Sequence, residues 1–210
     1  LSLEARRVWL LFYQLLTIHK VKNVVYIGAN NGQMALAINE AFPGLDFFLL
    51  EPVPKNFDIL VQNTREHKNM YCFNVAAGSS EDQCEMYVDE FLPASSLLRY
   101  SSVALEEFPF LGKNNAVKVS VHPLDDLLRD IPAVDMMIMD VQGYEDEVLK
   151  GASRCLQFCK IIMTELSLQP LYQDTSTFHS VYQTLINSGF HLFNLVNPVH
   201  GKSGRVLQID

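Results

Sequence analysis

The residues of this chain that can bind a ligand or move a proton are glycines after one apolar run and acidic side chains after others. An apolar run at residues 23–27 is followed by the turn G-A-N-N-G from Gly28 to Gly32 and by an amphipathic segment, residues 34–42. Glycine lets such a turn approach a ligand closely, and the free N–H groups at the start of a helix bind polar or anionic groups. The spacing matches neither the dinucleotide pattern G-x-G-x-x-G nor the nucleoside-triphosphate pattern G-x-x-x-x-G-K-[ST]. The turn predicts a ligand-binding strand, turn and helix, with a purely structural turn as the alternative.

Three acidic residues end other apolar runs. Glu51 follows the glycine turn by about twenty positions, where a carboxylate can accept both hydrogen bonds of a ribose diol. NAD and S-adenosylmethionine both carry that diol, and the turn favours the methyl donor because it lacks the pattern that holds a pyrophosphate. Asp140 ends the run at 134–139, and Glu165 ends the run at 160–164. The structural alternatives are a solvated turn for Glu51, a helix cap for Asp140 and an ordinary strand end for Glu165.

The elements that position these residues alternate between strands and helices. Further strands are predicted at residues 45–50, 70–76, 84–88, 116–121, 134–139 and 160–164, and helices at 54–66, 125–129, 145–158 and 177–187. Apolar strands that alternate with helices indicate an α/β fold, with a mostly parallel sheet covered by helices on both faces. Segments 190–195 and 205–209 are predicted to pair as an antiparallel hairpin at one edge. Ligands of such sheets bind beyond the carboxyl ends of the strands, where the glycine turn and the three acidic residues lie.

Two segments fall outside this alternation. Residues 8–18 are apolar at helical spacing and predict an N-terminal helix, within residues 1–20, that packs on the sheet. They are too few to span a membrane, and no signal-peptide cleavage site follows them. Residues 90–115 lack periodicity and contain Ser95, Ser96, Phe91, Tyr100, Phe108 and Phe110. We expect this segment to be a lid over a substrate, with a disordered or partner-binding loop as the alternative.

Composition and charge disfavour several classes of function. Lys plus Arg number 16 and Asp plus Glu number 24, so the net charge is −8, which disfavours binding to nucleic acid or to an anionic membrane. The four cysteines show no C-x-x-C spacing, and three lie in apolar runs. This pattern predicts free thiols in a reducing compartment, the cytoplasm. A length of 210 residues, 49% of them hydrophobic, predicts a single domain over residues 1–210.

A longer pattern covers residues 135–152. The sequence D-V-Q-G-Y-E-D-E-V-L-K-G from Asp140 to Gly151 resembles the signature of the FkbM-like methyltransferases, roughly K-I-D-V-Q-G-x-E-x-x-V-L-x-G. The family's G-A-N-x-G, E-P, third-strand end and L-D-D-L patterns are matched by residues 28–32, 51–52, 74–76 and 124–127. The resemblance spans roughly residues 21–166. It implies a Rossmann-like class I methyltransferase domain with a mostly parallel seven-stranded sheet, an antiparallel C-terminal hairpin and helices on both faces.

The resemblance also implies an activity and a set of site residues. We expect methylation of a hydroxyl on a sugar, lipid or polyketide-like small molecule, with S-adenosylmethionine as the cofactor. The expected cofactor-binding residues are Ile27, Gly28, Ala29, Asn30, Gly32, Glu51, Pro52, Asn74, Val75, Ala76 and Asp140. An alcohol must lose its proton as the oxygen attacks, and a nearby carboxylate can accept it. Asp140 is the first catalytic candidate, with Glu165 and Glu145 as its neighbours. These carboxylates can instead hold Mg²⁺ or Ca²⁺, but metal-free catalysis is favoured and no metal ligand is predicted.

Two positions depart from the family pattern. The family's aspartate two residues before Gly28 is Tyr26 here, and its lysine two residues before Asp140 is Ile138. Each shares a strand face with the motif residue that follows it. These changes predict altered chemistry or a rearranged cofactor contact. The alternative function is a catalytically silent binding or scaffolding module, and an NAD-dependent oxidoreductase is disfavoured by the missing pyrophosphate turn.

Overall fold

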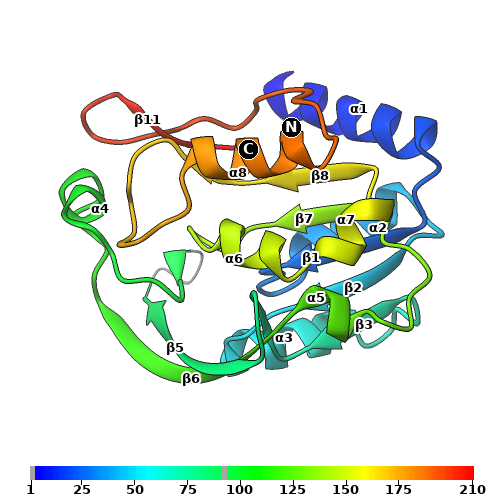
Figure 1. Ribbon diagram of the computed structural model, residues 1–210, viewed down its shortest axis with the longest axis horizontal. Helices are drawn as coiled ribbons and strands as arrows, with labels where there is room; N and C mark the ends of the chain where they lie inside the picture. Colours follow the sequence, from blue (N-terminus) through cyan, green and yellow to red (C-terminus); the bar gives the residue numbers. More distant parts are fainter. Residues whose placement is uncertain (1–2, 91–93) are drawn as a thin grey trace.

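Five parallel strands form the central sheet. The computed structural model describes residues 3–90 and 94–210. The strand order is β3 (Met70–Phe73), β2 (Asp46–Leu50), β1 (Asn23–Ile27), β7 (Met136–Met139) and β8 (Ile161–Thr164). From β1 the sheet continues with β2 and β3 toward one edge and with β7 and β8 toward the other. The order in which the strands are added therefore reverses between β1 and β7. Figure 1 shows these strands stacked across the molecule. The reversal marks the point where such sheets bind ligands.

Helices cover both faces of this sheet. Val24 and Tyr26 of β1 share a core with α1 (Leu3–Ile18), α2 (Gln33–Ala41) and α3 (Pro54–Thr64). The alternate residues Val25 and Ile27 share a second core with α5 (Leu124–Leu127), α6 (Glu145–Lys150), α7 (Ser153–Phe158) and α8 (Phe178–Asn187). Figure 1 shows α6, α7 and α8 in front of the sheet. Burial on both faces explains the uninterrupted apolar runs of the central strands and confirms the predicted fold class.

Two small sheets flank the central one. The first has the order β4 (Ala76–Ala77), β6 (Asn114–His122), β5 (Asp82–Asp89), with β5 and β6 antiparallel. The second has the order β10 (Val199–His200), β11 (Val206–Ile209), β9 (Leu166–Ser167). α4 (Ser102–Glu107) lies between β5 and β6 along the chain. None of the described helices is long and apolar enough to cross a membrane.

The sequence predictions were wrong on several elements. The central sheet has five strands rather than seven, because the chain leaves it after Phe73 and β4 pairs with β6 instead. Residues 190–195 form no strand and residues 191–195 are exposed, so the hairpin partner of β11 is β10. The helix predicted at 145–158 is divided into α6 and α7 by Gly151 and Ala152. Segment 90–115 contains α4 and the start of β6, and its residues 91–93, with Phe91, lie outside the described residues.

Candidate active site

The glycine turn is packed against the ends of two neighbouring strands. The backbone N–H groups of Gly28 and Ala29 donate to the Leu50 carbonyl oxygen at 3.0 and 2.9 Å. Gly28 has φ +82°, and a Cβ atom there would lie 1.9 Å from the carbonyl oxygen of Asp140. Only glycine combines this left-handed conformation with so close an approach. The turn therefore draws the ends of β1, β2 and β7 together.

Glu51 lies directly beside this turn and is 4% exposed. Its Oε2 accepts a hydrogen bond from Asn30 N at 2.8 Å, and its Oε1 accepts one from Val53 N at 2.9 Å. Burial raises the pKa of Glu51 to about 7, against the lowering effect of these two hydrogen bonds. The carboxylate thus fixes the glycine turn to the segment after β2.

The end of the third strand supports the same segment. Asn74 Nδ2 donates to the carbonyl oxygens of Glu51 and Pro52 at 2.8 and 3.1 Å. The next residues, Val75 and Ala76, face a cavity. Asn74 and Gly32 are not among the described residues that line this cavity. Both predicted binding residues instead contact the segments that form its wall.

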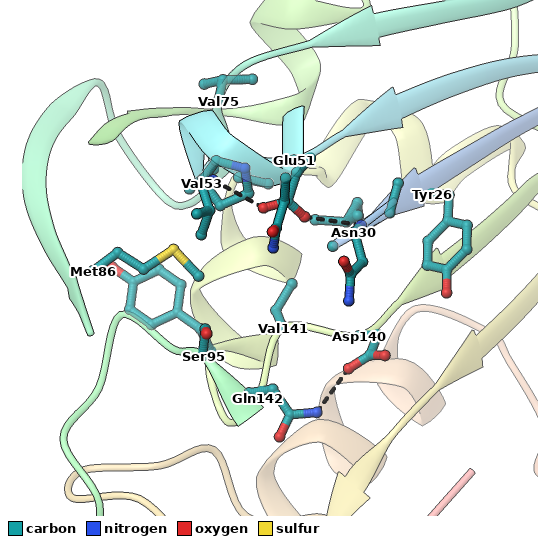
Figure 2. Close-up of a pocket in the computed structure, with 18 of the residues that line it drawn as sticks. Tyr26, Asn30, Glu51, Val53, Val75, Met86, Ser95, Asp140, Val141 and Gln142 are labelled. Carbon is teal, nitrogen blue, oxygen red and sulfur yellow. Dashed lines mark hydrogen bonds between the residues drawn. The ribbon is translucent and has the colours of Figure 1, made fainter. Parts of the chain in front are cut away.

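The cavity has a volume of about 500 Å³ and lies beyond the carboxyl ends of β1, β2 and β7 (Figure 2). The other nine predicted cofactor-binding residues line it: Ile27, Gly28, Ala29, Asn30, Glu51, Pro52, Val75, Ala76 and Asp140. The structure therefore brings together residues that are more than 110 positions apart in the sequence. Their role in binding a cofactor stays a prediction.

Sequence reasoning missed several lining residues. Asn56 comes from the first turn of α3, Met86 from β5, and Ser95 and Leu97 from the predicted lid. Asn56 lies shortly after the E-P pattern, so its position near the site could be predicted from the sequence. Met86 and the lid residues carry no local signal of their position. The described part of the lid is tied to the site, because Ser96 Oγ donates to the Gln142 carbonyl oxygen at 2.7 Å. Whether the segment acts as a lid stays a prediction.

At the β7 end of the cavity, one amide side chain bridges two carboxylates. Gln142 Nε2 donates to Asp140 Oδ1 at 2.8 Å and also to Glu165 Oε2 (Figure 2 shows the Asp140 contact). Gln208 Nε2 donates to the same oxygen of Glu165 at 2.9 Å, and Tyr172 Oη lies 2.7 Å from Gln142 Oε1. Among the described residues, only Gln142 hydrogen-bonds the Asp140 carboxylate, and it does so at Oδ1.

The two bridged carboxyl groups have different surroundings. Burial raises the pKa of Asp140, and its hydrogen bond from Gln142 opposes that shift. Burial also raises the pKa of Glu165, and the nearby charges of Asp140 and Asp210 raise it further. Such a coupled pair disfavours two negative charges close together, so the two groups titrate together rather than independently.

Glu145 is buried at the start of α6. Its Oε1 accepts a hydrogen bond from Gly143 N at 3.0 Å, and the residue is 2% exposed. Burial raises its pKa to about 7. Neither Glu145 nor Glu165 is among the described residues that line the cavity. Of the three catalytic candidates, only Asp140 reaches the cavity wall, and the roles of all three stay predictions.

The two departures from the family pattern are neighbours. Tyr26 of β1 is in register with Ile138 of β7, and both side chains are buried in the same core. An aspartate and a lysine at these positions would face each other as a pair of opposite charges, so their joint replacement leaves no unpaired charge behind. Tyr26 also lines the cavity, and Figure 2 shows its ring on the same side as Asp140. The described residues contain no group of three or more His, Cys, Asp or Glu side chains that can hold a metal ion.

Comparisons with known proteins give a relative in sequence and solved structures of similar fold. The 2-O-methyltransferase NoeI of Sinorhizobium fredii (strain NBRC 101917 / NGR234) is 24% identical over 170 residues, which cover 77% of this chain and 70% of that protein. Aeropyrum pernix fibrillarin in complex with natively bound S-adenosyl-L-methionine superposes with a TM-score of 0.52 at 12% identity, over 90% of this chain and 64% of that one. The StiE O-MT (residues 961–1257) gives 0.51 at 12%, over 91% and 53%.

The chain thus spans less than two thirds of the length of these two solved structures, and at 12% identity they show a common fold. The profile of the Methyltransferase FkbM domain matches residues 27–192, which contain the glycine turn, Glu51, the Asp140 signature and Glu165. This chain belongs to the FkbM methyltransferase domain family, a family of S-adenosylmethionine-dependent methyltransferases.

Proposed function

We propose that this chain binds S-adenosylmethionine in the cavity between Glu51 and Asp140 and transfers its methyl group to a hydroxyl oxygen of a small molecule. The observation that carries the proposal is the buried Glu51 carboxylate, held beside a glycine turn at the point where the strand order reverses. A carboxylate there is suited to the ribose diol of an adenosine. The turn offers no cradle for a pyrophosphate, which disfavours a dinucleotide.

The residues present fit such a cofactor. Gly28 packs directly on Asp140, so the glycine turn and the end of β7 form one continuous wall of the cavity. Val53, Val75 and Met86 supply apolar surface for the adenine base of the cofactor. A volume of about 500 Å³ lies within the usual range for small-molecule sites. The bound cofactor would supply a methyl group on a positively charged sulfur, and the carboxylates around Asp140 suit a positive charge at that end.

The chain's own contribution to catalysis is orientation and removal of a proton. Methyl transfer to an alcohol is an in-line displacement, so alignment of the two reactants and exclusion of water lower most of the barrier. Asp140 Oδ2 can accept the hydroxyl proton while Gln142 fixes Oδ1. The raised pKa of Glu165 disfavours a second full negative charge beside this base. We infer that Asp140 is the base and that Glu165 and Glu145 act by positioning.

The similarity to a 2-O-methyltransferase supports a hydroxyl oxygen as the acceptor. Sugars, lipids and polyketide-like alcohols are the acceptor classes we propose. All four cysteines are described and free, and free thiols are typical of proteins in a reducing compartment. We therefore propose a reducing compartment, the cytoplasm, as the place where the protein acts.

The experiment is transfer of radiolabelled methyl from S-adenosylmethionine to a panel of sugars, glycolipids and polyketide alcohols. The proposal predicts labelled product with at least one hydroxyl acceptor, and a loss of about 100-fold or more in turnover for Asp140→Asn, since a general base contributes about 10²–10⁴-fold. Cofactor binding without transfer to any acceptor would instead favour the silent module, for which Tyr26 and Ile138 are the supporting observations.

A further inference from the structure

Asn56 carries a buried acceptor atom without a partner. The residue lies in the first turn of α3, is 3% exposed and lines the cavity. Its Oδ1 is the buried side-chain atom that finds no hydrogen-bond partner among the described residues. An unsatisfied buried polar group costs about 1–3 kcal/mol, and most such groups in proteins are paired. An orphan acceptor in a cavity wall therefore points to a donor on a ligand.

Glu51 lies next to Asn56, and its own capacity to accept hydrogen bonds is largely used. A carboxylate offers about four lone-pair positions. Asn30 N and Val53 N occupy one on each oxygen, and the Asn56 side-chain amide interacts with the same carboxylate. About one position remains. The ribose diol of the cofactor presents two hydroxyl donors, so Glu51 alone does not satisfy both.

We propose that Asn56 Oδ1 accepts a hydrogen bond from one ribose hydroxyl while Glu51 accepts one from the other. The proposal rests on the proposed function, because it assumes that the adenosine end of the cofactor lies at Glu51. The Asn56 side chain interacts with the Glu51 carboxylate, and its unpartnered Oδ1 offers a second acceptor beside that group. The two side chains together then match a pair of adjacent hydroxyl groups.

The test is calorimetric binding of S-adenosylhomocysteine and its 2′-deoxy and 3′-deoxy analogues. The proteins are the wild type, Asn56→Leu, Glu51→Gln and the control Gln62→Leu, an exposed position on the same helix. Loss of one hydrogen bond predicts that Asn56→Leu binds S-adenosylhomocysteine roughly tenfold more weakly. The analogue that lacks the hydroxyl bound by Asn56 has no such hydrogen bond to lose, so it should bind wild type and Asn56→Leu equally. The other analogue should still bind Asn56→Leu more weakly. The effect of Glu51→Gln should disappear with the opposite analogue, and Gln62→Leu should match the wild type.

Several results would overturn the proposal. Equal binding by Asn56→Leu and wild type would show that Oδ1 meets no ligand donor. A loss that is the same for all three ligands would show a structural or base-directed role. Cancellation of both variants' effects by the same analogue would show that Asn56 acts only through Glu51. In each of these cases the wild type still binds and the proposed function stands, whereas a wild type that binds none of the three ligands contradicts both.

Discussion

The buried carboxyl groups in this site accept hydrogen bonds from N–H donors, and none of them forms a salt bridge with another described residue. Glu51 is held by Asn30 N and Val53 N, Glu145 by Gly143 N, and Asp140 by the Gln142 amide. Neutral donors offset the loss of hydration only in part, so the pKa of each group stays above its ordinary value. Tyr26 and Ile138 are in register and stand where the family pattern has an aspartate and a lysine, so neither position carries an unpaired charge. The pKa values of these carboxyl groups therefore lie closer to neutral pH than those of exposed carboxyl groups.

Glu145 gives a direct test of this electrostatic description. Its pKa of about 7 in the folded protein exceeds the ordinary value of 4.5, so its contribution to stability is full below about pH 4.5 and is lost as the pH rises through 7. Glu145→Gln removes that dependence. Between pH 5 and pH 8 the wild type should lose about 2–3 kcal/mol more unfolding free energy than the variant, measured by urea denaturation. Glu81→Gln, at an exposed position, is the control and should keep the wild-type slope. Parallel slopes for wild type and Glu145→Gln would contradict this description of Glu145.

The glycine turn is the element that joins the two ends of the cavity. Its first glycine contacts the carbonyl of Asp140, and its last packs against α3 at Leu60. The N–H of Asn30, inside the turn, reaches Glu51. One short segment therefore fixes the relative positions of β1, β2, β7 and α3.

Gly28→Ala should disturb all of these contacts. A Cβ atom 1.9 Å from the Asp140 carbonyl oxygen forces β1 and β7 apart. We expect a loss of about 3 kcal/mol or more in unfolding free energy and loss of S-adenosylhomocysteine binding. Gly44→Ala is the matched control, since Gly44 also has positive φ, +100°, but nothing lies within 4 Å of its Cβ position. It should cost only roughly 1–2 kcal/mol and leave binding intact. Equal effects of the two substitutions on binding would contradict the role of the turn.

Sequence patterns predicted the elements whose burial is continuous and failed where pairing is decided at a distance. The apolar runs that became β1, β2, β7 and β8 were predictable because both faces of each are buried. The end of the third strand was not, because Asn74 turns away to hold the carbonyls of Glu51 and Pro52. Residues 190–195 have a strand-like composition, but only Val196, just after them, pairs with Asp210.

The residues of the candidate site also fall into two groups, those that the sequence predicts and those that it does not. Motif residues such as Gly28, Glu51 and Asp140 were predictable because strand ends in a parallel sheet converge. Met86 and Ser95 line the cavity because β5 and residues 95–97 lie against it, which no local pattern records. Gln142 stood inside a recognised motif, but its function as a bridge depends on Glu165, which lies in another part of the chain.

At the scale of the whole molecule, three regions that are separate in the fold contribute residues to the cavity. The central sheet supplies its floor, the β4–β6–β5 sheet supplies Met86 and Ala76, and the described part of segment 90–115 supplies Ser95. Figure 1 shows the long β5 and β6 ribbon at the lower left of the molecule, whereas the edge strand β8 and α1 lie at the top. A ligand in the cavity would therefore contact all three regions at once and join them.

Hydrogen exchange tests this arrangement. S-adenosylhomocysteine at about 100 times its dissociation constant should stabilise the folded state by about 2.7 kcal/mol. Exchange should slow at the glycine turn, residues 28–33, and at residues 51–56, 94–97 and 140–144, because opening these segments releases the ligand. Beyond the global effect, α8 should show no local protection. Protection concentrated at α8 would place the ligand elsewhere in the molecule.

The measurement that tests the central claim most directly is calorimetric titration of S-adenosylhomocysteine into the wild type, Glu51→Ala and Glu40→Ala. Glu40 is exposed on α2 and serves as the control. The proposed cofactor position predicts binding in the micromolar range for the wild type and the control. It predicts at least roughly tenfold weaker binding for Glu51→Ala, since a hydrogen bond to a charged group contributes about 1.5–3 kcal/mol. Absence of binding by the wild type, or unchanged binding by a folded Glu51→Ala, would contradict it.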